Sequence, residues 1–234
     1  TLLREHRSIP PIGVFFENLV KRLPCFADFR KIFGKSGYHQ PPSIRFMSIS
    51  NSSDASLPRL QRLLLTGAAG GLGKVLRERL VPYAQVLRVS DIAALGDAQG
   101  PHEEVVACDL ADKQAVDALL AGCDAIVHLG GVSVERPFEE ILEANIKGIF
   151  NVYEAARRHG VKRVVFASSN HVIGFYKQTD PLDANVLRRP DGYYGLSKSF
   201  GEDMAQFYFD RYGIETVSIR IGSSFPEPLN RRMM

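Results

Sequence analysis

From Leu60 onwards, short apolar runs alternate with longer segments in which apolar residues recur at helical spacing. The first such pair is the run Leu63–Leu65, followed by a segment that carries Val75, Leu76 and Leu80. Apolar runs bounded by turn residues are typical of strands buried on both faces, and apolar residues three or four positions apart are typical of amphipathic helices. The pattern therefore predicts strands and helices in regular alternation.

The same alternation continues to residue 221. Further strands are predicted at Ala84–Val89, Glu104–Asp109, Ala125–His128, Arg163–Ala167 and Thr216–Ile221. Further helices are predicted at Lys113–Ala121, Phe138–Arg158 and Tyr194–Tyr212. Gly160 and Gly213 end the last two helices, since glycine is common just after a helix. Alternating strands and helices predict an α/β fold with a doubly wound parallel sheet, the Rossmann fold, in which ligands bind beyond the carboxyl ends of the strands.

Three glycines, Gly67, Gly70 and Gly73, lie between the first predicted strand and the first helix. The free N–H groups at a helix start suit a pyrophosphate, and glycine lets the backbone approach that anion. Asp91, at the end of the second strand, is placed to accept from both hydroxyls of an adenosine ribose and to repel a 2′-phosphate. This order of features predicts NAD rather than NADP as the cofactor. The alternative is an ordinary strand-to-helix turn that happens to be rich in glycine.

Composition narrows the functional classes. Of the 234 residues, 45% are hydrophobic and 24% charged, as in a globular protein, and a net charge of +3 gives no reason to expect a nucleic-acid partner. Three scattered cysteines without a C-x-x-C motif favour a reducing compartment, so we expect the cytoplasm. The histidines show no metal-ligand spacing, and no apolar run approaches the ~18 residues that span a bilayer. We therefore expect neither a metal site nor a membrane partner.

Residues 1–57 differ in character from the rest, so we divide the chain into an N-terminal extension, 1–57, and an NAD-binding Rossmann domain, 58–234. Residues 1–46 carry eight Lys or Arg and three acidic residues, and Met47 is the first methionine. One interpretation is a basic targeting segment, and another is a small partner-binding helix at Phe15–Leu23. We favour a third, in which the true start is Met47 and the extension is non-native or disordered.

The catalytic candidates follow the fifth predicted strand. Ser168–His171 closes that strand, and Tyr194–Lys198 opens the next helix. Tyr194 and Lys198 are four residues apart and share one helix face, so we expect the lysine to lower the pKa of the phenol. A phenolate can take a proton from a substrate hydroxyl, and the Ser169 hydroxyl can hold the same oxygen. The alternative is a buried tyrosine beside a solvated lysine, because Y-x-x-x-K recurs by chance in helices.

Taken in order, these motifs resemble the extended short-chain dehydrogenase/reductase family, the NAD-dependent epimerase/dehydratase superfamily. The resemblance implies that Ser169, Tyr194 and Lys198 are catalytic and that Asn145 has a structural role in its helix. It implies cofactor contacts from Gly67, Gly70, Gly71, Leu72, Gly73, Asp91, Asp109, Leu110, Leu129, Gly130, Gly131, Lys198 and Ser224. From the residues alone, Asp109 is also a candidate cap for the helix at Lys113, and His128 is expected to be buried and bonded to the backbone.

Within this family, the segments 129–138, 167–174, 189–198 and 221–233 resemble the members that oxidise uronic acids. This implies NAD-dependent oxidation of glucuronate or galacturonate at C1 to the aldarolactone by hydride transfer. The sugar acid would contact Ser133, Ser169, Asn170, His171, Ser223 and Arg232. Arg232 would pair with the carboxylate, and the alternative for it is an exposed charge. The other hypotheses are a sugar-nucleotide epimerase or dehydratase, a nucleotide-sensing regulator, and an inactive truncated product.

Members of this family continue beyond the position of Met234 with a strand and helices that cover the substrate pocket. The resemblance therefore implies that the C-terminal substrate-lid part of the fold is missing from this chain. A homo-oligomer of the full-length protein is compatible with this interpretation.

Overall fold

The computed structural model describes residues 59–222. The extension 1–57 and the candidate residues Ser223, Ser224 and Arg232 lie outside the described residues. Within residues 59–222, no helix has both the length and the apolar character needed to cross a membrane.

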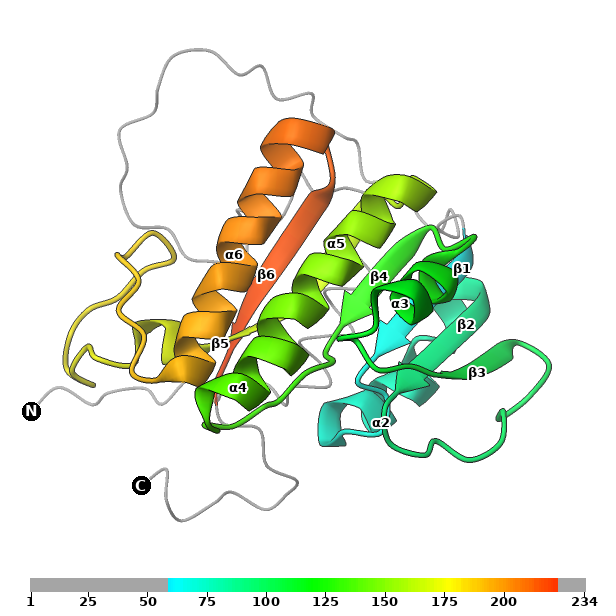
Figure 1. Ribbon diagram of the computed structural model, residues 1–234, viewed down its shortest axis with the longest axis horizontal. Coiled ribbons are helices and arrows are strands. Elements are labelled where there is room, and N and C mark those ends of the chain that lie inside the picture. The colour runs from blue at the N-terminus through cyan, green and yellow to red at the C-terminus, as the bar shows by residue number, and fades with distance from the viewer. Residues whose placement is uncertain (1–58, 223–234) are drawn as a thin grey trace, which may run out of the picture. The chain divides into compact units, whose positions relative to one another are not determined.

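One parallel sheet organises the fold (Figure 1). Its strands are β1 (Leu60–Thr66), β2 (Ala84–Asp91), β3 (Glu103–Ala107), β4 (Ala125–His128), β5 (Arg163–Ser169) and β6 (Glu215–Ile221). They pair in the order β3-β2-β1-β4-β5-β6, and every neighbouring pair is parallel. The chain thus winds outward in both directions from β1 and β4, which confirms the predicted doubly wound sheet.

Helices cover the sheet on both faces. They are α2 (Gly71–Arg79), η2 (Val81–Tyr83), α3 (Lys113–Leu120), α4 (Phe138–Ile141), η3 (Leu142–Lys147), α5 (Gly148–His159), η4 (Asn170–Ile173) and α6 (Tyr193–Tyr212). In Figure 1, α3, α5 and α6 lie side by side in front of the sheet. The connection from β1 to β2 through α2 runs in the opposite direction along the sheet, so a right-handed crossover places α2 on the other face.

The main core lies between the sheet and the front helices. It contains Leu64 and Ile126 from the two central strands, Val152 and Tyr153 from α5, and Tyr208 from α6, all almost without solvent contact. The rings of Tyr153 and Tyr208 stack with their centroids 5.0 Å apart, which joins the two helices. Burial of this many large apolar side chains is the main force that fixes the helices on the sheet.

The structure corrects the long helix predicted over Phe138–Arg158. The helical path is continuous, but it consists of α4, a π-helical segment, η3, and α5. Asn145 lies in the π-helical segment, and its side chain is buried against the chain that follows β4. Such wide turns are common near functional sites. The predicted ends at Gly160 and Gly213 are confirmed, since both adopt the left-handed conformation with φ of 73° and 69°.

The third strand is also shorter than predicted. β3 ends at Ala107, so Cys108 and Asp109 lie in the turn before α3. The cap of α3 is Asp112, which accepts from the N–H groups of Gln114 and Ala115. The idea that Asp109 caps this helix is therefore wrong, because Asp112 stands next to the first helical residue.

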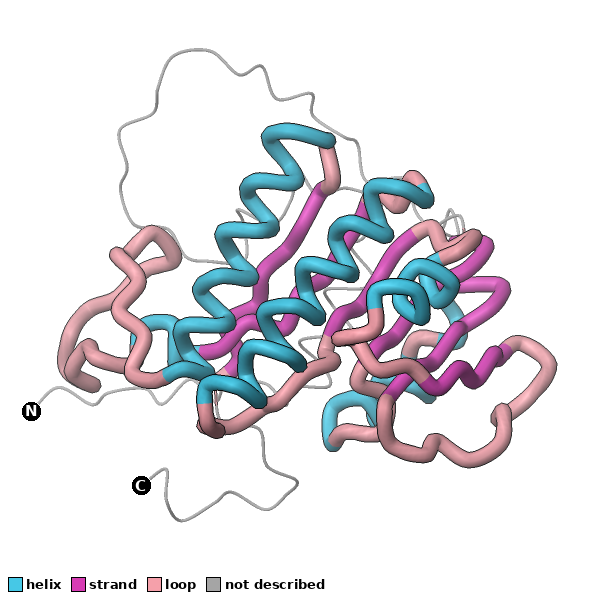
Figure 2. Tube along the Cα trace, in the orientation of Figure 1, coloured by secondary structure: helices cyan, strands magenta, loops and turns pink. Residues whose placement is uncertain are grey.

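Figure 2 shows two long loops, residues 92–102 between β2 and β3 and residues 174–192 before α6.

Candidate functional site

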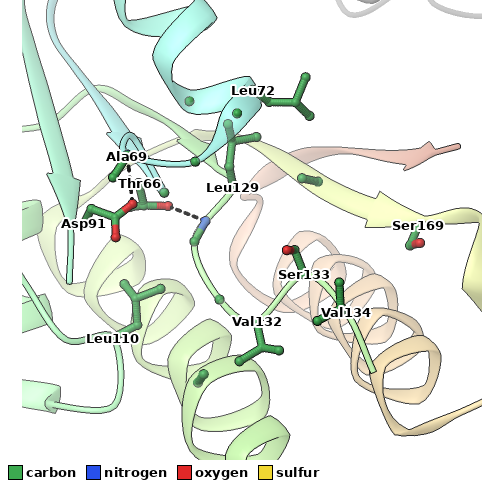
Figure 3. A pocket seen from close by; sticks show the side chains of 18 of the residues that line it. Thr66, Ala69, Leu72, Asp91, Leu110, Leu129, Val132, Ser133, Val134 and Ser169 are labelled. Carbon is green, nitrogen blue, oxygen red and sulfur yellow. Dashed lines mark hydrogen bonds between the residues drawn. The ribbon is translucent and has the colours of Figure 1, made fainter. Parts of the chain in front are cut away.

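A cleft of about 910 Å³ lies at the carboxyl ends of the strands. Figure 3 shows Asp91 at one end of it and Ser169 at the other. The predicted site residues within the described part of the chain all line this cleft: Gly67, Gly70, Gly71, Leu72, Gly73, Asp91, Asp109, Leu110, Leu129, Gly130, Gly131, Ser133, Ser169, Asn170, His171, Tyr194 and Lys198. The structure thus brings together residues from six segments of the chain, and their individual roles stay predictions.

The glycine turn has no room for side chains at two positions. A Cβ atom at Gly73 would lie 2.1 Å from the carbonyl oxygen of Gly67, so α2 could not start so close to β1. Gly67 has φ of 72°, and a Cβ there would lie 2.7 Å from the backbone of Leu129 and Gly130. The turn after β1 and the turn after β4 therefore touch, with their backbones open to the cleft.

Asp91 is tied to the glycine turn. One carboxylate oxygen accepts from the N–H of Ala69 at 2.9 Å, and the other accepts from the N–H of Ala93 at 3.0 Å. Each oxygen keeps a further lone pair for a ligand hydroxyl. Arg88 points away from this end of the cleft, since its guanidinium pairs with Glu104 at 2.7 Å. The charge next to the glycine turn is thus negative.

The floor of the cleft contains a buried pair that joins β1 to β4. The hydroxyl of Thr66 lies 2.8 Å from Nδ1 of His128 and accepts from the N–H of Gly130 at 3.2 Å. Burial is the main cause that lowers the pKa of His128 to about 3, and the charge of Lys198 adds to it. His128 is buried, as expected, but its partner is a side-chain hydroxyl and not the backbone. Thr66 was missed because a threonine at a strand end carries no signal of its own.

Tyr194 and Lys198 share the inner face of α6, and both are buried. The ammonium group of Lys198 donates to the carbonyl of Ala167 at 2.9 Å and lies 5.6 Å from the ring centroid of Tyr194. Burial lowers the pKa of Lys198 to about 8. The lysine is therefore not solvated, and the alternative of a solvated lysine is wrong.

The expected fall in the pKa of Tyr194 is not what the structure shows. Burial raises the pKa of its phenol, and a hydrogen bond with Ser169 only opposes that shift. Burial is the physical reason for this rise, and neither Ser169 nor the nearby Lys198, which donates to the carbonyl of Ala167, overcomes it. The phenol is consequently a weaker acid in this structure than the sequence suggested.

The far end of the cleft is polar. Ser169 accepts from the N–H of His171 at 3.2 Å, and Nδ1 of His171 lies 2.9 Å from both carboxylate oxygens of Asp191. The His171 ring meets the Tyr194 ring edge-on, with centroids 5.5 Å apart. Asp191 thereby holds the Nδ1 side of the His171 ring, a role that the sequence did not indicate.

Two other anchors hold this region: the family resemblance implied a structural role for Asn145, whereas the sequence did not indicate Glu135. Glu135 accepts from the first N–H groups of α6, at Tyr193 and Tyr194, and Asn145 bonds both to the backbone of Val132 and to Ser197. These partners are far apart along the chain, so no local pattern connects them. Within residues 59–222, no group of His, Cys, Asp and Glu is arranged to hold a metal ion.

Comparison with known proteins agrees with this geometry. Residues 63–228 match the model of the NAD dependent epimerase/dehydratase family. Uronate dehydrogenase of Pseudomonas syringae pv. tomato is 78% identical over 173 residues, which cover 74% of this chain and 63% of that protein. Uronate dehydrogenase of Agrobacterium fabrum is 61% identical over 175 residues, covering 75% of this chain and 66% of the relative.

Solved structures show the same likeness. The crystal structure of uronate dehydrogenase from Agrobacterium tumefaciens has a TM-score of 0.71 and 62% identity, and the aligned part covers 74% of this chain and 65% of that one. The chain thus spans less than two thirds of these relatives. The family match covers the glycine turn, the strand ends and the helix of Tyr194 and Lys198. The chain belongs to the NAD dependent epimerase/dehydratase family.

Proposed function

We propose that this chain carries the NAD site and the catalytic residues of a dehydrogenase that oxidises a hexuronate at C1 to the aldarolactone. One observation carries the proposal: a single cleft has a glycine turn with Asp91 at one end and Ser169 with Tyr194 and Lys198 at the other. The identities of 78% and 61% to relatives named uronate dehydrogenase support the substrate class.

The residues present fit NAD. The start of α2 has no side-chain cap, so its free N–H groups face the cleft, where a Cβ at Gly73 would collide with the turn. Asp91 has lone pairs for two ribose hydroxyls and would repel a 2′-phosphate. When bound, NAD supplies the nicotinamide that accepts a hydride from C1 of the sugar.

The side chains at the Ser169 end of the cleft transfer the proton. In its ionised form, Tyr194 takes the proton of the C1 hydroxyl, and Ser169 donates a hydrogen bond to the same oxygen. Lys198, held by Ala167 beside the phenol, stabilises its ionised form during this transfer. The loss of one hydride and one proton leaves a carbonyl at C1, which is the lactone.

Several finer statements stay predictions from the sequence. Arg232 and Ser223 as contacts of the sugar acid, and Ser224 as a cofactor contact, lie outside the described residues. Residence in the cytoplasm and assembly into a homo-oligomer rest on the cysteine pattern and on the family resemblance.

The test is to incubate the purified chain with NAD and each uronate, and to follow NADH by absorbance. A second sample carries the C-terminal part of the Pseudomonas syringae relative joined to the chain, because the match covers 63% of that protein. NADH should form from glucuronate or galacturonate, slowly or not at all from glucose, and far less with NADP. Equal rates on glucose would contradict the substrate class. Conversion of a nucleotide sugar without net NADH would indicate an epimerase instead.

A further inference from the structure

We propose that Glu135 is a positioning residue that fixes the backbone of Tyr194 to the β4–α4 loop, residues 129–137. This loop lines the cleft through Gly130, Gly131 and Ser133. Glu135 would thereby set where the Tyr194 hydroxyl lies relative to the bound reactants. The inference rests on the proposed function and adds a residue to its machinery.

The carboxylate of Glu135 binds the start of α6 with both oxygens. Oε1 accepts from the N–H of Tyr193 at 2.8 Å, and Oε2 accepts from the N–H of Tyr194 at 2.9 Å. The helix has no cap of its own here, since Gly192 offers no side chain and the first turn contains no acidic residue. A negative charge at a helix start satisfies free donors and interacts favourably with the helix dipole.

A second chain of contacts joins the same loop to the carbonyl group of Tyr194. Asn145 accepts from the N–H of Val132 at 2.7 Å and donates to its carbonyl at 3.0 Å. The same amide group donates to Ser197 at 2.9 Å, and Ser197 donates to the carbonyl of Tyr194 at 2.7 Å. The loop therefore holds Tyr194 through its N–H on one side and through its C=O on the other.

The fit at Glu135 is close. A Cβ atom at Gly192 would lie 2.4 Å from Oε2 of Glu135, so the carboxylate occupies space that any larger residue would take. Phe138, just after the loop, packs against Tyr193 with ring centroids 5.4 Å apart. The loop and the first turn of α6 are consequently built as one unit.

Release of this unit should affect the phenol more than the cofactor. The ring of Tyr194 faces Lys198 of its own helix, His171 of η4 and the hydroxyl of Ser169. Asp91 lies at the opposite end of the cleft (Figure 3). A loosened helix start would let the phenol move toward water and away from the reacting oxygen, where small misplacements are costly.

The test compares Glu135→Gln with Glu139→Gln, a matched change at an exposed glutamate of α4. Three quantities are measured: kcat with glucuronate, the Kd of NAD, and the tyrosinate midpoint of Tyr194. The midpoint comes from absorbance titration of each protein against the same protein carrying Tyr194→Phe. Glutamine has one acceptor oxygen and no charge, so it can accept from only one of the two N–H groups, those of Tyr193 and Tyr194, that Glu135 binds.

We expect Glu135→Gln to lower kcat about ten- to a hundredfold while the Kd of NAD changes less than about twofold. The tyrosinate midpoint should fall, because burial is what raises the pKa of Tyr194. Glu139→Gln should change none of the three. Unchanged kcat and midpoint in Glu135→Gln, or a lower Tm alone, would overturn the proposal.

Two further outcomes are informative. If no protein oxidises a uronate, the proposed function fails, and the midpoint together with NAD binding still decides the role of Glu135. If Glu135→Gln does not fold, Glu135→Asp replaces it, and the expected result is a smaller fall of the same sign in kcat and midpoint. An unchanged Glu135→Asp protein would then overturn the proposal.

Discussion

At Tyr194, neighbouring residues affect acidity in opposite directions. Burial raises the pKa of the phenol, whereas a hydrogen bond with Ser169 lowers it, and Lys198 is itself buried enough to bring its pKa to about 8. Charged lysine next to the ring favours the ionised phenol as long as the lysine keeps its proton. Turnover should therefore rise with pH until Lys198 begins to lose its charge.

Replacement of Tyr194 by phenylalanine should remove most turnover, because phenylalanine has no hydroxyl group to take the proton of the substrate. General acid–base help is typically worth ~10²–10⁴-fold, and we expect a loss of kcat in that range with the Kd of NAD nearly unchanged. Tyr193→Phe is the matched control, since Tyr193 is half-exposed and packs on Phe138 instead of facing the cleft. Wild-type turnover in Tyr194→Phe would point to a different base.

His128 links the floor of the cleft to the pH dependence of stability. Its pKa of about 3 in the folded state is below the value of about 6.5 for free histidine, so below that pH only the unfolded chain takes up the proton. Stability from this residue is complete above about pH 6.5 and falls as the pH drops, by about 1.4 kcal/mol per unit.

The variant His128→Asn tests this, because asparagine does not titrate and keeps an acceptor near Thr66. Between about pH 6.5 and pH 4.5, the free energy of unfolding of the wild type should fall about 2–3 kcal/mol more than that of the variant. Urea unfolding at a series of pH values measures both curves. Parallel curves would mean that His128 titrates normally in the folded protein.

Among the secondary-structure elements, the strands and helices whose residues follow a local apolar pattern could be predicted from the sequence. The strands and the helix ends at Gly160 and Gly213 follow from apolar spacing and glycine positions. The π-helical turn around Asn145 could not be predicted, because it depends on contacts with Val132 and Ser197 that form only after folding. In the cleft, the glycine turn, Asp91 and Tyr194 could be predicted from the order of motifs along the chain. Glu135 could not, because it contacts α6 from a distant segment of the chain.

The glycine turn between β1 and α2 offers a matched pair of substitutions. Gly73→Ala would push a methyl group to 2.1 Å from the carbonyl of Gly67, while a Cβ at Gly71 has no atom within 4 Å. We expect Gly73→Ala to lower the free energy of unfolding by about 1–3 kcal/mol and to weaken NAD binding. Gly71→Ala should leave the free energy of unfolding unchanged or raise it by up to about 1 kcal/mol. Denaturant unfolding and NAD titration measure the pair, and equal behaviour of the two would contradict the geometry.

At the scale of the whole molecule, the order of the strands in the sheet determines where the cleft lies. The strands run outward in both directions from β1 and β4, so the turns that follow these two strands meet in the crevice between them. Gly67 and Gly130 face each other there at the backbone level. The end of the cleft predicted to bind the cofactor carries Asp91 at the end of β2, and the end predicted to transfer the proton carries Ser169 at the end of β5.

We also expect residues 1–46 to contribute nothing to this fold or to catalysis. A chain that starts at Met47 should keep the thermal stability and the NAD affinity of the 234-residue chain, since the predicted NAD-binding domain begins only at residue 58. Thermal unfolding and NAD titration of the two proteins provide the comparison. A clear loss of either in the shorter chain would support a docking or targeting segment instead.

The two hydrogen bonds that Asp91 accepts, from Ala69 and Ala93, limit how cofactor preference can change. A neutral or basic replacement that accommodates a 2′-phosphate removes at least one of the two oxygens that accept from these N–H groups, so a change of cofactor specificity also changes local stability. We therefore expect a switch to NADP to work best when the change at Asp91 is combined with changes in the turn that give these N–H groups new acceptors. This coupling predicts that single substitutions at Asp91 yield weak binders of both NAD and NADP before they yield a protein selective for NADP.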